Sequence, residues 1–392
     1  MVVPAAAAPE CGRREAAAAA AAAVFCRRGR GVVVPTVDMS APAGRGELSR
    51  QVARACAGSG FFRAVNHGVP PRVSAAMDAG AAAFFARAGA EKQLAGPPDP
   101  LGYGSRSIGA NGDVGELEYL ILHASPDAVA RKASAIDRED PRRFRYAIAI
   151  HAAYARNFNR SRITLRSQVV NDYVEAVRQL ACHVLDLLGE GLGLRDPTSL
   201  TRLITATDND SLIRINHYPP SCAAAAGDHK SGGGPAPTAA IGFGEHTDPQ
   251  ILSVLRANDA DGLQLLLPDA AAAGDSVWVP VPPDPSAFFV NVGDLLQALT
   301  NGRLVSIRHR VVVGTGKPRL STIYFAAPPL HARISALPET VAAGAPRRYR
   351  AFTWAEYKRT MYTLRLSHNR LDLFHAGDGD GDAGVGDDDD HE

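Results

Sequence analysis

The 392-residue sequence lacks any run of about 18 or more apolar residues free of charge, which is the length that a membrane-spanning helix requires. Its five cysteines are scattered and odd in number, with no Cys-x-x-Cys pair, so neither a disulfide framework nor a cysteine-rich zinc site is expected. Neither sign of charge dominates, because 42 basic residues stand against 41 acidic residues. We therefore expect no nucleic-acid partner, no membrane partner and a reducing, cytoplasmic location.

Both ends of the chain have low sequence complexity. Residues 1–31 contain Arg13 and Arg14 ahead of a long alanine run, and they contain no serine. A targeting peptide also begins with basic and small residues, but Glu15 and the lack of a leucine-rich stretch favour a disordered leader. Residues 376–392 are mostly glycine and aspartate, which predicts a disordered acidic tail.

The region 32–209 is predicted to be mixed and largely helical. Its expected elements are a short strand within 32–38, helices at 46–57 and 71–87, a strand at 60–65 and a long helix at 169–192. Apolar residues of the long helix recur at spacings of three and four, the pattern of a helix that lies on a core. We expect these helices to form an N-terminal layer.

From residue 210 onward, short β-rich runs alternate with turn signals, which indicates a β-sandwich or barrel. We expect this domain to span 210–375 and to end with a helix near Trp354–Leu366. The stretch Ala223–Ala240 contains little except alanine, glycine and proline. It is expected to loop out between two strands without carrying chemistry.

A candidate metal site begins at the motif Gly244-Glu245-His246-Thr247-Asp248. Alternate side chains of a strand share a face, so His246 and Asp248 are expected to point the same way. His309 begins a later apolar β-run and can supply a third ligand. Two imidazoles and one carboxylate form a facial triad, which leaves three of the six iron positions open. A lone His-x-Asp motif is more often a pair of exposed surface residues that bind no metal, so the prediction depends on the later histidine.

A second candidate cluster follows ten residues after His309. Arg319 and Ser321 are two apart on a predicted strand, and a guanidinium beside a hydroxyl suits a terminal carboxylate. Tyr218 can donate its phenol to the same carboxylate, and Asn216 can form a hydrogen bond near the iron. The alternative for Arg319 is a surface arginine in a turn.

Together these motifs resemble the plant 2-oxoglutarate- and iron(II)-dependent dioxygenase family. The family marks are Gly60-Phe61-Phe62, Asn66-His67-Gly68, Asn216-x-Tyr218-Pro219, His246-x-Asp248, His309 and Arg319-x-Ser321. Within that family the chain resembles the gibberellin 2-oxidases. This narrower resemblance depends on Gly102-Tyr103-Gly104, Asn111-Gly112-Asp113-Val114-Gly115, Glu118-Tyr119-Leu120, Gly242 to Gln250 and Asn369-Arg370-Leu371.

The resemblance implies an α+β fold with a double-stranded β-helix (jelly-roll) core, a helical N-terminal layer and a C-terminal helix. It implies iron(II) at the predicted triad, 2-oxoglutarate and O2 as co-substrates, and ascorbate as reductant. The implied reaction hydroxylates a gibberellin at C2 on the β face and thereby inactivates the hormone. Because a gibberellin is an apolar skeleton with a carboxylate, Arg106, Lys358 and Tyr362 are our candidates for contacting it.

The sequence departs from the family pattern in two places. Glu116 stands where relatives carry a tryptophan, and Tyr146–Arg166 has no recognisable counterpart. The insert is either a genuine basic loop or non-native sequence from a gene model, and we favour the second interpretation. Two other functions stay open: oxygenation of another plant metabolite such as a flavonoid, and a catalytically silent binding protein of the same fold.

Overall fold

The computed structural model describes residues 34–93, 95, 97, 101–108, 112–124, 160–220, 240–268, 275–314 and 316–377, with only the backbone described for 160–168. The predicted leader 1–31 and nearly all of the predicted tail 376–392 lie outside the described residues. The same holds for the predicted loop Ala223–Ala240 except its last residue, and for Tyr146–Arg166 except its last seven residues.

Eight strands form the larger of two main sheets. They are β1 (Thr36–Asp38), β2 (Phe61–Val65), β3 (Gly102–Ile108), β4 (Asp113–His123), β5 (Leu212–Tyr218), β7 (Leu252–Ala257), β10 (Phe288–Val292) and β12 (Arg319–Ala326). Their order across the sheet is β1-β2-β10-β7-β12-β5-β4-β3. Every pair except the parallel β1–β2 pair is antiparallel.

The second sheet has the order β6-β11-β8-β9. Its strands are β6 (Ala240–His246), β8 (Leu263–Pro268), β9 (Ser276–Pro280) and β11 (His309–Val313). Buried apolar side chains from both sheets, among them Phe61, Tyr218, Phe243 and Leu265, form one cluster. Two antiparallel sheets that share an apolar core confirm the predicted α+β class with a β-sandwich.

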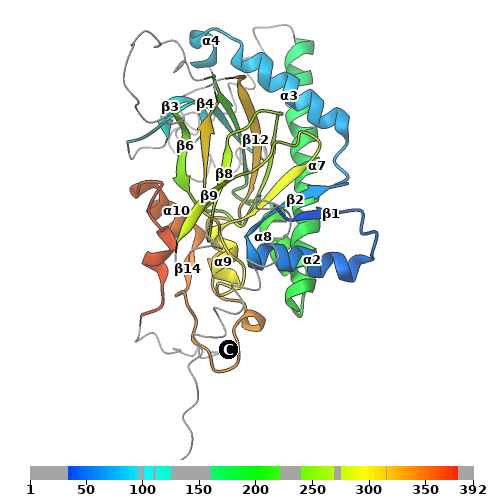
Figure 1. Cartoon of the computed structure of the whole chain (residues 1–392), viewed down its shortest axis with the longest axis vertical. Helices are drawn as coiled ribbons and strands as arrows, with labels where there is room; N and C mark the ends of the chain where they lie inside the picture. Colours follow the sequence, from blue (N-terminus) through cyan, green and yellow to red (C-terminus); the bar gives the residue numbers. More distant parts are fainter. Residues whose placement is uncertain are drawn as a thin grey trace, which may run out of the picture.

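The helices lie mainly on one side of the large sheet (Figure 1). The α-helices are α2 (Arg45–Gly58), α3 (Pro71–Phe85), α4 (Gly89–Gln93), α7 (Arg160–Leu192), α8 (Ser199–Thr205), α9 (Asp294–Leu299) and α10 (Trp354–Thr363). Smaller elements are η2 (Pro338–Thr340), η3 (Arg370–Phe374), β13 (Arg333–Ile334) and β14 (Phe352–Thr353). No helix in the described part of the chain has both the length and the apolar character needed to cross a bilayer.

Helix α7 forms the centre of the helical layer, as its sequence pattern predicts. Val177, Val184 and Leu188 are completely buried, and they belong to a cluster that also contains side chains from α2, α3 and the large sheet. The helix is longer than predicted. It begins at Arg160, so the last seven residues of Tyr146–Arg166 are helical and not part of a loop.

Alternation along β5 and β12 separates the helix-facing core from the interior of the sandwich. Ile215 on β5 and Tyr324 on β12 belong to the cluster beneath the helices. Tyr218, Arg319 and Ser321 lie on the other face and line a cavity between the sheets. The period of two in a strand thus places one set of side chains in the supporting core and the next set in the site.

Candidate active site

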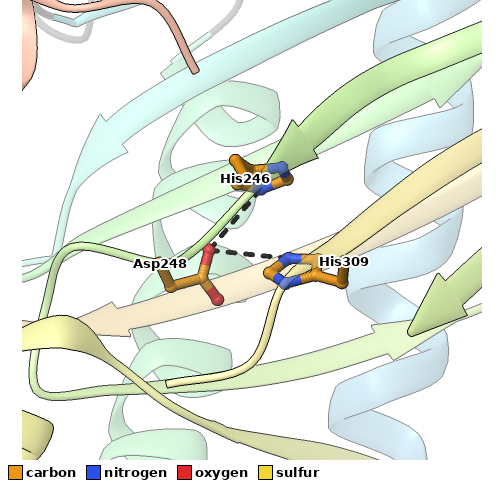
Figure 2. A group of neighbouring side chains, drawn as sticks. All are labelled: His246, Asp248 and His309. Atoms are coloured by element: carbon orange, nitrogen blue, oxygen red, sulfur yellow. Dashed lines mark ion pairs between the residues drawn. The ribbon is translucent and has the colours of Figure 1, made fainter. Parts of the chain in front are cut away.

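The three predicted metal ligands converge at the ends of two paired strands. His246 is the last residue of β6 and His309 the first of β11, and these residues are direct partners in the antiparallel register. Asp248 lies just beyond β6, so its side chain approaches through a turn and not through the alternation that the sequence predicted. Figure 2 shows Asp248 directed toward both imidazoles.

One carboxylate oxygen faces both histidines. Asp248 Oδ1 lies 3.7 Å from His246 Nε2 and 3.7 Å from His309 Nε2. The opposite ring nitrogens face backbone carbonyls: His246 Nδ1 is 2.8 Å from the Gly244 oxygen and His309 Nδ1 is 3.2 Å from the Ile307 oxygen. With Nδ1–H donating to a carbonyl, each Nε2 keeps its lone pair for a metal.

The second oxygen of Asp248 is held by a buried amide. Asn291 Nδ2 donates to Asp248 Oδ2 over 2.6 Å. Burial alone would raise the pKa of Asp248, but His309, His246 and this hydrogen bond together lower it below its ordinary value. The carboxylate is therefore ionised, as metal ligation requires.

His246 is also in its metal-binding form. Burial and the neighbouring His309 lower the pKa of His246 to about 3. The candidate ligand atoms of the triad all lie within 4.8 Å of one another. Two imidazoles and one carboxylate on the same side of a centre fit iron(II), and they leave other positions for co-substrates.

The predicted carboxylate cluster is assembled beside the triad. Arg319 pairs with Tyr218 across β12 and β5, and Ser321 pairs with Asn216. Arg319 Nε and Nη1 and Ser321 Oγ are buried and have no hydrogen-bond partner among the residues that the structure describes. Unpaired buried donors are costly unless a ligand satisfies them. The unpaired guanidinium and hydroxyl therefore fit the distal carboxylate of 2-oxoglutarate.

Apolar residues form most of the wall of the cavity that contains both clusters. They come from both sheets and from the C-terminal segment, and they include Phe61, Ile108, Phe243, Leu255, Leu263, Val311, Ile323, Phe325, Met361, Leu364 and Leu366. A cavity of this kind binds an apolar ligand and orients it through a few polar groups.

Of the three predicted substrate contacts, only Tyr362 lines the cavity. Arg106 is exposed and pairs with Glu116 over 2.7 Å on the surface of the β3–β4 hairpin. Lys358 is held by Asp210 over 2.5 Å. Both cations therefore pair with acidic neighbours and are not among the residues that line the cavity, so their substrate role stays a prediction.

Sequence reasoning missed three polar residues of the site. Arg214 and Arg370 line the cavity, and Asn291 holds Asp248. A signal for Arg214 was present, because it precedes Asn216 and Tyr218 at spacings of two and four on one strand. Arg370, on η3, belongs to the motif Asn369-Arg370-Leu371, from which no role for its side chain was predicted, and no comparable signal marks Asn291 on β10.

Two histidines outside the triad, His217 and His67, have hydrogen-bond partners of their own. His217 Nδ1 lies 2.9 Å from Glu118 Oε1, and its ring stacks on Phe85, on the helix side of the sheet. His67 Nε2 lies 3.1 Å from the Ser286 carbonyl. Neither histidine lines the cavity that contains the triad.

Comparison with known proteins gives two matches to family profiles. Residues 209–328 match the 2OG-Fe(II) oxygenase superfamily, and residues 34–136 match the non-haem dioxygenase in morphine synthesis N-terminal family. The chain is 94% identical to gibberellin 2-beta-dioxygenase 2 of Oryza sativa subsp. japonica, with all of both chains covered. It is 59% identical to gibberellin 2-beta-dioxygenase 1 of the same organism, over 88% of each chain. Its identity to the gibberellin 2-beta-dioxygenase of Phaseolus coccineus is 43%, over 87% of this chain and 90% of the relative.

Solved structures of plant oxygenases have the same fold. A rice dioxygenase for auxin oxidation superposes with a TM-score of 0.64 at 28% identity, covering 88% of this chain and all of the other. JOX2 in complex with 2OG, Fe and JA superposes with a TM-score of 0.67 at 26% identity, covering 88% of this chain and 89% of the other. These likenesses confirm the predicted jelly-roll core with its helical layer.

Proposed function

This chain belongs to the 2OG-Fe(II) oxygenase superfamily, and we propose that it hydroxylates gibberellins at C2 with His246, Asp248 and His309 as its iron ligands. The observation that carries the substrate is the 94% identity, over the whole chain, to a rice gibberellin 2-beta-dioxygenase. The observation that carries the chemistry is the convergence of two imidazoles and one carboxylate in an apolar cavity. The enzyme is thus a gibberellin 2-beta-dioxygenase.

The reaction consumes one gibberellin, one 2-oxoglutarate and one O2. It yields the 2β-hydroxylated gibberellin, succinate and carbon dioxide. Bound iron(II), together with 2-oxoglutarate and O2, supplies the oxidising power that removes hydrogen from an unactivated carbon. The protein's own task is to bind, orient and shield the reactants.

Each polar cluster performs one part of that task. The triad holds the metal, and Asn291 keeps the Asp248 carboxylate oriented toward it. Arg319 and Ser321 bind the distal carboxylate of 2-oxoglutarate with charge-assisted and neutral hydrogen bonds, and Tyr218 lies beside them in register. These contacts fix the co-substrate along β5 and β12, beside the iron ligands.

The cavity walls are suited to a rigid, apolar substrate. Phe61 and Phe243 contribute aromatic surface, and Leu263 and Leu366 contribute aliphatic surface. Tyr362 presents a polar phenol on an otherwise apolar body at the same cavity. Enclosure by these side chains excludes water from the reacting carbon.

Mass spectrometry of gibberellin products tests this function. The purified full chain with iron(II), 2-oxoglutarate, O2 and ascorbate should convert a gibberellin into its 2β-hydroxy product, with one succinate released per turnover. A flavanone offered under the same conditions should release no additional succinate. His246→Ala should abolish turnover while leaving the folded state nearly unchanged, because the ligand lines an open site. Conversion of the flavanone alone, or no conversion of either substrate, would refute the proposal.

A further inference from the structure

A cation without an acidic partner lies inside the cavity, apart from the arginine that binds 2-oxoglutarate. Arg214 lines the cavity, and its Nη2 is buried and has no hydrogen-bond partner. Its Nε donates to Asn216 Oδ1 over 2.8 Å. The structure leaves one terminal amino group of this guanidinium directed at nothing within the described residues.

Two aromatic rings fix the plane of this guanidinium. The Arg214 Cζ lies 4.1 Å from the centroid of the Tyr119 ring and 4.9 Å from that of Phe243. With Nε tied to Asn216 and both rings in contact, the side chain has little freedom left. A guanidinium oriented in this way offers its Nη2 as a preformed, charged donor, which suits a carboxylate oxygen.

Arg214 is separated along the strand from the 2-oxoglutarate cluster. In the register of β5 and β12, Tyr218 lies opposite Arg319, whereas Arg214 lies opposite Ile323. Four residues of extended strand correspond to roughly 13 Å between the backbone positions. One small dicarboxylate that is bound at Arg319 therefore does not account for Arg214 as well.

Within the described part of the chain, the charge of Arg214 also lacks an acidic partner. Asp248 acts on it electrostatically, but the oxygens of Asp248 already face Asn291 and the two imidazoles. Arg370 differs, because it lies near Asp294: burial raises the pKa of Asp294, and Arg370 opposes that rise. An enclosed cation without a carboxylate is costly, so an anion supplied by a ligand would stabilise it.

We propose that Arg214 binds the carboxylate of the substrate and thereby selects acidic over neutral skeletons. This inference depends on the proposed gibberellin substrate, which combines an apolar skeleton with a carboxylate. Arg214, which is held in place by the rings of Tyr119 and Phe243, binds the acid end of the substrate. The apolar walls of the cavity contact the skeleton. The carboxylate thereby sets which part of the skeleton reaches the triad.

The test compares a gibberellin with its methyl ester, which keeps the skeleton and loses the charge. Anaerobic equilibrium binding is measured with the iron- and 2-oxoglutarate-loaded enzyme, so that no turnover occurs. Wild type should bind the acid more tightly than the ester by roughly ten- to hundredfold, the contribution of charge-assisted hydrogen bonds. Arg214→Gln should bind both about equally, and Arg214→Lys should keep part of the preference.

A purely structural role for Arg214 predicts a lower thermal unfolding temperature and an unchanged acid-to-ester ratio in Arg214→Gln. The substrate-binding role predicts the reverse. Removing an unpaired buried cation should leave the thermal unfolding temperature of Arg214→Gln equal or higher when substrate is absent. Arg178→Gln, which removes an α7 arginine paired with Glu175 outside the cavity, is the matched control and should keep the wild-type preference. If Arg214→Gln fails to fold, the acid-to-ester ratio of Arg214→Lys decides the question.

The outcomes separate the two proposals. An unchanged acid-to-ester ratio in Arg214→Gln, or in Arg214→Lys if only that variant folds, would overturn the role of Arg214 and leave the gibberellin function standing. A wild-type enzyme that binds neither acid nor ester would overturn the proposed function and this inference with it. Loss of the preference in Arg214→Gln together with full stability would establish the carboxylate site.

Discussion

The carboxylate of Asp248 has a different task at each of its oxygens. Oδ1 faces the imidazoles of His246 and His309, while Oδ2 accepts a hydrogen bond from Asn291 on β10. Asn291 is 4% exposed, so no solvent can replace this bond. Outer hydrogen bonds of this kind orient a ligand and maintain its charge, and they contribute to metal affinity without touching the metal.

We therefore expect Asn291→Ala to weaken iron(II) binding by roughly ten- to hundredfold. Anaerobic equilibrium titration with iron(II) measures the change. Asn258→Ala is a suitable control, because the Asn258 side chain bonds the backbone of Pro318 and Leu320 and does not line the cavity. Wild-type iron affinity in Asn291→Ala would mean that Asp248 holds its orientation without the amide.

At this scale the sequence predicted the groups that follow short motifs and missed those brought in by tertiary structure. The His-x-Asp and Arg-x-Ser spacings are local signals and predicted both clusters, although alternation along a strand applies to Arg319 and Ser321 on β12 and not to Asp248, which lies beyond the end of β6. Arg106 was assigned to the substrate although Glu116, ten residues later, neutralises it on the hairpin surface. Only the pairing of β3 with β4 brings these two residues together.

At the scale of secondary-structure elements, helix α7 was predicted well and the hairpin of β3 and β4 was not predicted. Leucine and valine repeat along α7 with a clear helical period, and the helix is buried along that face. Strand β4 places Glu116 and Glu118 among its apolar residues. Lys92, Tyr103 and His217 satisfy the Glu118 carboxylate, a set of partners that no local pattern reveals.

The insert Tyr146–Arg166 supplies a prediction about this helix. Its last seven residues form the first turns of α7, and among the α7 residues whose side chains are described, 169–192, the completely buried ones begin at Tyr173. Deleting 146–166 therefore removes none of these buried contacts, and closing a shorter connection costs little entropy. We expect an equal or higher unfolding temperature, with gibberellin hydroxylation preserved.

Thermal unfolding and product analysis of the deletion variant measure both expectations. Replacing the same residues with a Gly/Ser linker of equal length controls for the length of the connection. A deletion variant that aggregates, or that changes its choice among gibberellins, would make the insert an integral part of the enzyme. Our preference for a foreign segment would then be wrong.

At the scale of the whole molecule, the predicted division at residue 209/210 separates strands that belong to one sheet. Strands β1 to β4 precede that point and β5 follows it, yet all five lie in the eight-stranded sheet. Hydrophobic patterning distinguished a helical half from a β-rich half because the spacing of apolar residues depends on the local type of secondary structure. It does not report which strands pair, since pairing over long sequence separations depends on the assembled core.

The cavity is lined by residues from both sheets and from the C-terminal segment. Arg319 belongs to the large sheet, His309 to the small sheet and Arg370 to the C-terminal segment, and all three line it. A ligand that bridges these parts binds only the folded state. Its binding free energy should therefore appear in the stability of the entire molecule.

The last prediction measures that coupling through 2-oxoglutarate. With iron present, 2-oxoglutarate at about 100 times its Kd should raise the free energy of unfolding by about 2.7 kcal/mol. Arg319→Lys keeps the charge but loses the fork geometry, so we expect a Kd that is roughly ten- to hundredfold higher. At the same concentration the stabilisation should then fall to about 1.4 kcal/mol for a tenfold change, or about 0.4 kcal/mol for a hundredfold change. Chemical unfolding with and without 2-oxoglutarate gives both values, and Arg333→Lys, at the exposed residue of β13, should keep the full wild-type shift. A full shift in Arg319→Lys would remove Arg319 from the co-substrate site, because a lost ion-pair geometry cannot leave the linked stability unchanged.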